Sequence, residues 1–571
     1  MKRILCLIAL LFSLTTELQA QRRLTAQELN IGVTQEFENF NPLIMSMMAT
    51  TYMYRMVART LNVLDENGEW VPQLAEVIPS LENGLARRTT IDGHPMIEAL
   101  WKIKSNASWG DGTPVTCRDV KFSWEVALSP MVSISEKEIY DQVKEIVIDE
   151  KNPKDCLLRY REAKWTYNRL ATFFIVPEHL ERPIFEQFGN QAEGYEQHSN
   201  YTRNPTHPGL FNGPYRISEI KLGSHVRFER NPYFYGKPSF FERVVVKLIP
   251  NTGTLEANLR SGTIDMVSAL GMSFDQAIAF DEKVKKDDLP FDVNFQPSLV
   301  YEHIDFNLDH PVLKDQVVRQ ALLMSIDREA LTQGLFGGRQ PVALHNTSPL
   351  DPWFTDDPKK IKIHPFSRRQ AKRLLDQHGW VVAADGVRAK DGQRLSFTLM
   401  TTAGNRVREL VQVYLQDQWR SIGADVQVKN EPARVFFGET TRKRKFDGMA
   451  MYAWISSPES NPRSTLSSKS IPSEENGWSG QNQPGWRNAR VDELVFKLDL
   501  EFDPEKRLAM IHEILFLYTS ELPVLPLYYR SDVSVTPKSL RGYKLPGHQF
   551  PATNHIENWT LVDGVNEGAK L

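Results

Sequence analysis

Leu395-Ser396-Phe397-Thr398-Leu399 begins the stretch of sequence that decides the fold class, and Val426-Gln427-Val428 ends it. In both runs apolar residues alternate with polar ones, which is the period of a half-buried β-strand. Between them, Asn405 can start a long amphipathic helix that Gly423 ends. A strand, a helix and a second strand in this order predict a parallel β–α–β unit between about residues 395 and 430.

Strand-like runs and amphipathic helices continue to alternate on both sides of this unit, which predicts an α/β protein. Thr116 can cap one of these helices, with Asp119 at its third position. Ser367 opens another helix, which Gly379 stops. The chain contains no internal repeats and no low-complexity tracts.

Two segments are expected to form loops. Residues 186–210 are rich in Gln, Asn, Gly, His and Pro, and residues 456–488 combine Ser, Pro, Asn and Gly with Trp478 and Trp486. We expect the two tryptophans to pin the second loop to the body of the protein. The alternative is that they line a ligand cleft.

Size and charge exclude several classes of partner. The 571 residues are 41% hydrophobic and 24% charged, and this length allows two to four folding units. The formal net charge of -3 gives no reason to expect nucleic acid or an anionic membrane as a partner. The basic run 442–445 is expected to be a solvated surface turn.

Residues 1–20 have the layout of a secretory signal peptide. Lys2 and Arg3 precede an apolar run from Ile4 to Leu14, and Ala20 offers a small residue at a cleavage position. The run is shorter than the roughly 20 residues that cross a bilayer comfortably. No later segment reaches that length without charges. We therefore expect the mature chain to be soluble and exported.

The sequence does not decide whether two of the three cysteines form a disulfide. Cys6 departs with the signal peptide, and it lies too close to Met1 to be a lipid-anchored cysteine, so no lipid anchor is expected. Cys117 and Cys156 remain, and in an oxidising compartment they can form one disulfide. The alternative is two unpaired buried thiols, and the spacing alone does not choose between them.

Several short motifs carry a family likeness because they occur together and in a fixed order. They are Trp70–Glu76, Trp109–Thr116 followed by Asp119-Val120 and Phe122-Ser123, Asn212–Tyr215, Asn231–Tyr233, Arg319–Leu322 with Ile326–Arg328, and Ala371–Trp380. With them the sequence resembles the family 5 extracellular solute-binding proteins, the oligopeptide, dipeptide and nickel binders of bacterial import systems. The likeness runs from about Leu29 to Asn558.

The resemblance implies a bilobal periplasmic-binding-protein fold of type II with an extra subdomain. It predicts two mixed α/β lobes, joined by hinge strands near Ser298–Asn307 and Pro523–Arg530. Lobe I is expected to comprise residues 21–63, 205–297 and 530–571, the inserted subdomain residues 64–204, and lobe II residues 298–529. The lobes of such proteins close on a ligand by a hinge motion. The resemblance implies no catalytic residues, no metal site and no cofactor.

The predicted ligand strand is Met449 to Ile455. In peptide-binding relatives, the segment around the residue that corresponds to Trp454, here with Ala453 and Ile455 beside it, supplies backbone groups to the ligand. A nearby Asp in those relatives pairs with the peptide's ammonium, but here Ser457 stands at that position. Glu459 is the candidate substitute anion. A serine does not neutralise a buried ammonium, which costs several kcal/mol to leave unpaired.

Further lining residues are expected from their positions in the chain. They are Phe37, Glu38 and Asn39 in the loop after the first strand, Tyr301 on the first hinge strand, Tyr528 and Tyr529 on the second, and Tyr140 in the inserted subdomain. The alternative for each is ordinary packing or solvent exposure.

The function that follows from the resemblance is periplasmic capture of a short peptide or similar small polar solute and its delivery to an inner-membrane ABC permease. The protein is expected to act as a monomer. A nickel or metal-chelate carrier is the alternative ligand class, although His548 and His555 stand far from the expected cleft. A ligand sensor or periplasmic chaperone is another alternative. An exported hydrolase is the rival from a different class, but the chain lacks a Gly-x-Ser-x-Gly elbow, a His-Glu-x-x-His helix and a phosphate-binding loop.

Overall fold

The computed structural model of the chain describes residues 24–25, 27–37, 39–91, 93–476 and 478–562. The predicted signal peptide, Cys6 and Glu38 lie outside these residues. In the part of the chain that the structure describes, none of the helices combines the length and the apolar character needed to cross a bilayer.

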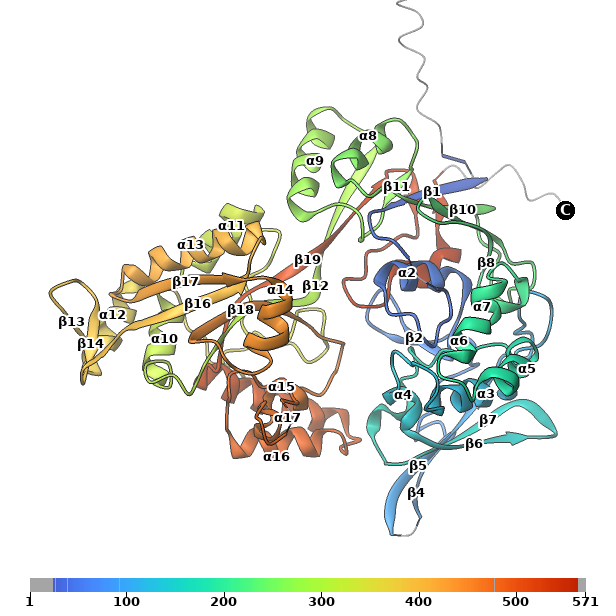
Figure 1. Cartoon of the computed structure of the whole chain (residues 1–571), viewed down its shortest axis with the longest axis horizontal. Coiled ribbons are helices and arrows are strands. Elements are labelled where there is room, and N and C mark those ends of the chain that lie inside the picture. Colours follow the sequence, from blue (N-terminus) through green and yellow to red (C-terminus); the bar gives the residue numbers. More distant parts are fainter. Residues whose placement is uncertain (1–23, 26, 38, 92, 477, 563–571) are drawn as a thin grey trace, which may run out of the picture.

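One large mixed sheet extends through the molecule (Figure 1). Its ten strands, in spatial order, are β17 (Asp425–Glu431), β16 (Ser396–Thr402), β18 (Gly448–Ile455), β12 (Phe291–Phe306), β19 (Val524–Pro537), β11 (Met266–Val267), β1 (Glu28–Val33), β10 (Arg243–Leu248), β9 (His225–Arg230) and β8 (Tyr215–Lys221). Strands β17, β16 and β18 belong to one body, which we call lobe II. Strands β1, β10, β9 and β8 belong to the other, which we call lobe I.

Helices cover the sheet in both lobes. Lobe II carries α10 (Gln316–Met324), α11 (Arg328–Phe336), α12 (Arg368–Gln377), α13 (Arg406–Arg420), α14 (Ala433–Val435), α15 (Arg463–Leu466), α16 (Ala489–Leu498) and α17 (Pro504–Glu521). The lobe I side carries α2 (Met48–Val57), α8 (Leu255–Arg260) and α9 (Phe274–Lys286).

A separate four-stranded sheet lies beside lobe I (Figure 1). It consists of β4 (Ala86–Ile91), β5 (His94–Lys102), β7 (Asn152–Tyr160) and β6 (Val143–Asp149), and the helices α3 (Cys117–Leu128), α4 (Glu138–Asp141), α5 (Glu178–Phe188), α6 (Gly194–His198) and α7 (Asn200–Arg203) accompany it. We call this unit the inserted subdomain. The small sheets are β2 (Asn62–Leu64) with β3 (Trp70–Pro72), β13 (Val381–Val382) with β14 (Arg388–Lys390) and β15 (Gln393–Arg394), and β20 (Leu540–Arg541) with β21 (Thr560–Leu561).

Strands β12 and β19 cross between the two lobes (Figure 1). They pair as an antiparallel ladder from Phe291 to Pro297 and again from Tyr301 to Asp305, with a shift of register in between. At the break, the hydroxyl of Ser298 donates to the carbonyl of Arg530 at 3.0 Å. The ladder extends beyond the predicted crossing segments because its lobe I half continues to Phe291 and Pro537.

The predicted β–α–β unit is confirmed. β16 and β17 pair in parallel, with Phe397 opposite Val426, and α13 connects them. The side chain of Asn405 accepts a hydrogen bond from the Arg408 backbone N–H at 3.1 Å and so caps α13. Gly423 follows the helix with a φ of +85°, a conformation that favours glycine.

The two other predicted helix starts are also confirmed. Thr116 and Asp119 form a reciprocal capping box at the start of α3. Ser367 caps α12 by accepting from the backbone N–H of Gln370 at 3.2 Å.

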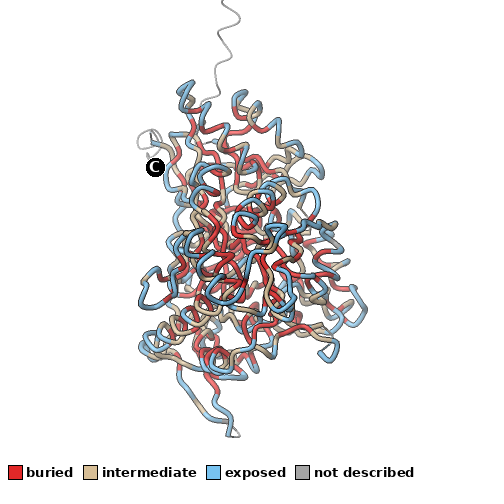
Figure 2. The backbone as a smooth tube through the Cα atoms, turned by 90° about the vertical axis from the view of Figure 1, so that its left-hand side faces the viewer, coloured by how far each residue is buried: buried red, intermediate tan, exposed pale blue. Residues whose placement is uncertain are grey.

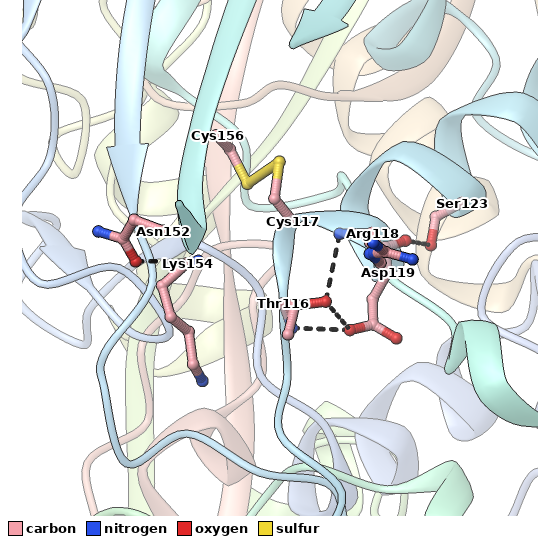
Figure 3. The surroundings of a disulfide bond; sticks show 8 residues. All are labelled: Thr116, Cys117, Arg118, Asp119, Ser123, Asn152, Lys154 and Cys156. Carbon is pink, nitrogen blue, oxygen red and sulfur yellow. Dashed lines mark hydrogen bonds between the residues drawn. A yellow bond between two sulfur atoms is a disulfide. The ribbon is translucent and has the colours of Figure 1, made fainter. Parts of the chain in front are cut away.

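Cys117 and Cys156 form a disulfide, which decides between the two alternatives left by the sequence (Figure 3). Their Cα atoms lie 5.3 Å apart. Cys117 is the first residue of α3 and Cys156 lies on β7. The bond therefore joins a helix of the inserted subdomain to its sheet, at a helix end that the capping box also fixes.

The hydrophobic core is divided into several clusters. One lies in lobe I and the inserted subdomain, another in lobe II around α10, α13 and β18, and another beneath α8 and α9. Figure 2 shows the buried backbone running through the middle of the molecule, with exposed loops around it. Lobe I and the inserted subdomain therefore share one apolar core, lobe II has a separate one, and β12 and β19 contribute to more than one cluster.

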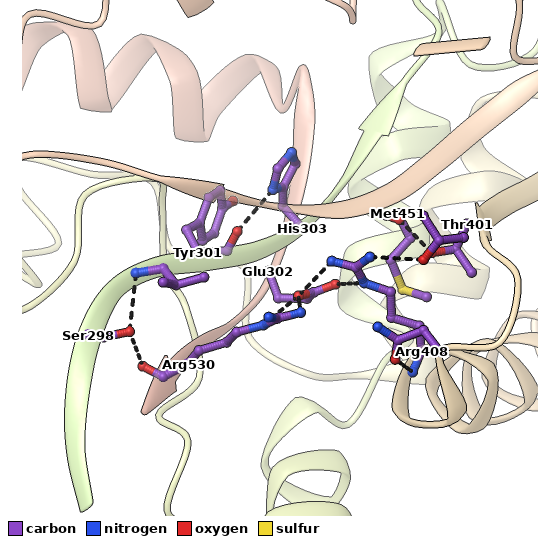
Figure 4. Close-up of polar contacts among 11 residues, drawn as sticks. Ser298, Tyr301, Glu302, His303, Thr401, Arg408, Met451 and Arg530 are labelled. Atoms are coloured by element: carbon purple, nitrogen blue, oxygen red, sulfur yellow. Dashed lines mark hydrogen bonds and ion pairs between the residues drawn. The ribbon is translucent and has the colours of Figure 1, made fainter. Parts of the chain in front are cut away.

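A buried ionic cluster fixes the crossing strands just past the break in their ladder (Figure 4). The fully buried carboxylate of Glu302 on β12 accepts from Arg408 of α13 at 2.6 Å and from Arg530 of β19 at 2.9 Å. Burial by itself raises the pKa of Glu302, but the two arginines outweigh burial and hold the pKa below its ordinary value. The cluster therefore ties both crossing strands to a helix of lobe II.

Glu302→Gln should lower the free energy of unfolding by about 3 kcal/mol at neutral pH, because it leaves the buried charge of Arg408 uncompensated. The folded-state pKa of Glu302 is depressed, so its stabilisation is complete above the ordinary pKa of 4.5 and is lost as the pH falls through the folded-state value. Urea denaturation at neutral pH and near pH 3 measures both effects. The exposed Glu474→Gln serves as the control and should have no effect. Equal stability of Glu302→Gln and wild type at neutral pH would contradict this role.

Candidate ligand-binding site

Strands β12 and β18 present an aromatic and polar face. Tyr301, His303 and Asp305 are two residues apart on β12 and therefore project from the same side of the sheet. On β18, Trp454 pairs with Tyr301 and Tyr452 pairs with His303, so they share that side. The rings of Tyr301 and His303 are stacked with centroids 5.0 Å apart.

A cavity of about 230 Å³ lies against this face, and we call it the inner cavity. Its lining comes from β12, the end of β18, the loops around residues 346–353 and 455–486, and α17. Trp486 lines the cavity and also anchors its loop, because its indole N–H donates to Glu521 at 2.7 Å. Both readings of the loop tryptophans therefore apply to Trp486, whereas Trp478 is not part of the lining.

The inner cavity contains two buried carboxylates that the sequence did not single out. Asp305 accepts a hydrogen bond from the hydroxyl of Tyr452. Asp351 accepts from the backbone N–H of Trp353 at 2.9 Å and from that of Glu459 at 3.0 Å. Burial raises the pKa of Asp351 to about 6, and the nearby carboxylate of Glu459 adds to the effect.

A second cavity of about 780 Å³, the outer cavity, lies between the inserted subdomain and lobe II. It shares Ser460, Asn461 and Ser464 with the inner cavity, so the two spaces adjoin. Residues 160–167 of the inserted subdomain form one side of it, and residues 459–470 form another.

The inserted subdomain and lobe II touch beside these cavities. Arg169 forms an ion pair with Glu459 at 2.6 Å, and the backbone N–H of Trp165 donates to the carbonyl of Asp499 at 3.2 Å. The rings of Trp165 and Trp353 lie with centroids 6.0 Å apart. Contacts between the inserted subdomain and lobe II therefore form part of the boundary of the two cavities.

The family model for bacterial extracellular solute-binding proteins, family 5 (middle region), matches residues 98–473, which is well over half of the chain. The chain is a family 5 extracellular solute-binding protein. The family resemblance and the bilobal α/β fold predicted from the sequence are both confirmed.

Relatives with known ligands are similar over almost the whole chain. The oligopeptide-binding protein AppA of Bacillus subtilis (strain 168) is 28% identical over 542 residues, which cover 94% of this chain and 92% of AppA. The crystal structure of an oligopeptide binding protein from Thermus thermophilus, complexed with a pentapeptide, has a TM-score of 0.66 at 28% identity and covers 94% of this chain and 96% of that one. NikZ from Campylobacter jejuni, in complex with Ni(L-His), shares the fold with a TM-score of 0.68 at 24% identity and covers 94% of this chain and 100% of that one.

Four of the residues predicted for the ligand site line the inner cavity of this solute-binding protein: Tyr301, Trp454, Ile455 and Ser457. The hydroxyl of Ser457 accepts a hydrogen bond from the side-chain amide of Gln549 at 3.0 Å. Ala453 pairs with Glu302 and so belongs to the opposite face of the sheet.

Glu459 lies at the outer cavity rather than the inner one. Its carboxylate is already engaged by Arg169, and its backbone N–H by Asp351. The candidate substitute for the missing Asp therefore takes part in a contact between the inserted subdomain and lobe II. The carboxylates that line the inner cavity together with Ser457 are those of Asp305 and Asp351.

Among the described residues, the other lining candidates are absent from both cavities: Phe37, Asn39, Tyr140, Tyr528 and Tyr529. Phe37 packs on Phe40, and the amide of Asn39 donates to Thr202. Tyr140 is buried and donates to the carbonyl of Phe174 at 3.0 Å. For these three residues the structure shows the packing and surface contacts that were the alternative.

The two hinge-strand tyrosines are buried. Tyr528 packs against Phe336, with ring centroids 4.8 Å apart. The hydroxyl of Tyr529 lies 2.8 Å from the carbonyl oxygens of both His345 and Thr347, which share its one proton. Because Thr347 lines the inner cavity, Tyr529 positions a wall of the site without lining it.

Trp454→Ala should weaken ligand binding by about 10-fold or more, because a large aromatic wall of the cavity is lost. The thermal midpoint should change little, since Trp454 is only partly buried. Isothermal titration calorimetry with a peptide that the wild-type protein binds measures the affinity. Phe366→Ala removes an exposed aromatic that does not line the cavity and serves as the control. Unchanged affinity of Trp454→Ala would remove the end of β18 from the site.

Proposed function

We propose that this protein captures a short peptide and hands it to an ABC importer, as the substrate-binding component of that system. The observation that carries the proposal is a free strand edge beside the cavities. β18 pairs with β12 from Met449 to Ile455, but its pairing with β16 stops at Ala450. No described strand pairs with the β16-side edge of residues 452–455.

A free edge of this kind suits an extended peptide. Its backbone amides and carbonyls can replace their water hydrogen bonds by pairing with the strand, while side chains enter neighbouring pockets. Such recognition depends little on peptide sequence, because the strand bonds to backbone groups. Trp454 and Ile455 lie at this edge and also line the inner cavity, so a peptide on the edge reaches that cavity, which adjoins the outer one.

The similarity to AppA and to the pentapeptide complex supports a peptide ligand. The family description as extracellular, together with the signal-peptide layout of residues 1–20, supports a periplasmic location. We extend the proposal to a monomer without catalytic activity. We also extend it to the division of the chain into lobe I (21–63, 205–297 and 530–571), inserted subdomain (64–204) and lobe II (298–529).

Tetra-alanine should bind to the purified protein and be recovered unchanged in mass. Methylation of one internal amide of the peptide should weaken binding about 10-fold, because it removes a donor to the strand. Isothermal titration gives the affinities, and native mass spectrometry of the complex gives the mass of the ligand. A protein that binds none of a set of di- to pentapeptides, or that cleaves them, would contradict the proposal.

A further inference from the structure

The inner cavity is negatively charged. Asp305 and Asp351 line it, and none of the described Lys or Arg residues does. His303 is the basic side chain of the lining. A cavity lined by buried carboxylates in this way attracts positive charge, because burying an uncompensated carboxylate is costly.

Neither carboxylate is neutralised by a described Lys or Arg within 4 Å. The positive charge of Arg169 acts on Asp351, but its guanidinium is paired with Glu459 at 2.6 Å. Asp305 holds only a neutral donor, the hydroxyl of Tyr452, and has His303 beside it. Both carboxylates therefore retain the capacity to bind a cation.

Three polar atoms of the lining are without a hydrogen-bond partner among the described residues, and one of them is the hydroxyl oxygen of Tyr301. Nε2 of His303, a residue only 1% exposed, lies 3.3 Å from Oδ1 of Asp305 without forming a hydrogen bond. The side-chain oxygen of Asn346 is likewise unpaired. Since buried polar atoms are nearly always satisfied, these atoms point to a polar group that enters the cavity.

Aromatic side chains form much of the remaining wall: Tyr301, Trp353, Trp454 and Trp486. Aromatic faces attract organic cations, most strongly in sites shielded from water. The same chemistry occurs next to the cavity, where the guanidinium groups of Arg169 and Arg507 lie 4.7 and 3.9 Å from the ring of Trp165.

The size of the inner cavity limits what it can hold. Its volume of about 230 Å³ is below the roughly 300 Å³ at which pockets for whole drug-sized ligands begin. It therefore suits one side-chain-sized group, while the adjoining outer cavity of about 780 Å³ has room for the rest of a ligand.

We propose that the inner cavity is a subsite for one organic cation, an ammonium or guanidinium group, which Asp305 and Asp351 bind between aromatic walls. With the Lys or Arg side chain of a peptide as its source, this inference rests on the proposed function. A free alkylammonium or guanidinium compound offers the same chemistry, and the experiment separates the two sources.

The test uses tetra-alanine peptides in which one lysine occupies each position in turn, and a matched set with norleucine, which lacks the charge. The terminal ammonium is the same in all of them. At the position that reaches the inner cavity, the lysine peptide should bind about 10-fold or more tightly than its norleucine match. Isothermal titration measures the ratio of the two affinities.

Two variants assign the effect to the carboxylates. Asp351→Asn and Asp305→Asn should each bring the lysine-to-norleucine affinity ratio toward 1. Asp391→Asn makes the same chemical change at an exposed turn between β14 and β15 and should leave the ratio unchanged. Because the readout is a ratio within one protein, a general loss of stability does not produce the expected result.

n-Butylammonium at millimolar concentration tests the second source by its shift of the thermal midpoint and by competition with peptides. If no peptide binds, the proposed function fails, and the binding of n-butylammonium alone then decides the inference. If peptides bind but no position prefers lysine, and n-butylammonium does not bind either, the cation subsite is overturned while the proposed function stands.

Discussion

The ladder between β12 and β19 is the constraint on which the rest of the structure depends. These strands join lobe I to lobe II, and their pairing is interrupted between Pro297 and Tyr301. Directly after the interruption, Glu302 is held by arginines from α13 and β19. On the other face of the same strand, Tyr301, His303 and Asp305 line the inner cavity. One strand therefore carries both the interruption in the ladder between the lobes and a wall of the inner cavity.

Enclosure of a polar ligand requires that every hydrogen bond it loses to water is replaced. The free edge of β18 offers backbone groups for this purpose, and the inner cavity offers carboxylates, an imidazole and an amide. The contacts that bring the inserted subdomain against lobe II are both polar, as in the pair of Arg169 and Glu459, and aromatic, as in the pair of Trp165 and Trp353. A ligand shifts the population of the closed state only by as much as it binds that state better than the open one.

The sequence predicted the parts of the fold that depend on local patterns. The β–α–β unit of β16, α13 and β17 follows from alternation and capping, as do the helix starts at Thr116 and Ser367. The sequence did not decide whether Cys117 and Cys156 pair, because the bond forms only where α3 packs against β7, and no local sequence pattern predicts that packing.

Of the residues that the family resemblance suggested, Trp454, Ile455 and Ser457 line the inner cavity, and so does Tyr301, which was expected from its position in the chain. Asp351 was missed because no local sequence pattern distinguishes its loop. It lines the cavity only because long-range folding brings its carboxylate to the backbone N–H of Glu459. Position in the chain also suggested Tyr140 and Tyr528, yet both are buried in packing, since a residue's place in a subdomain does not tell which way its side chain points.

The central claim is that the two lobes shut around a solute that remains chemically unchanged. Small-angle X-ray scattering of the purified protein, with and without a peptide shown to bind, tests it most directly. The account predicts a smaller radius of gyration in the presence of the peptide, because the lobes close about the interruption in the β12–β19 ladder. Superimposable scattering curves at saturating peptide would contradict it.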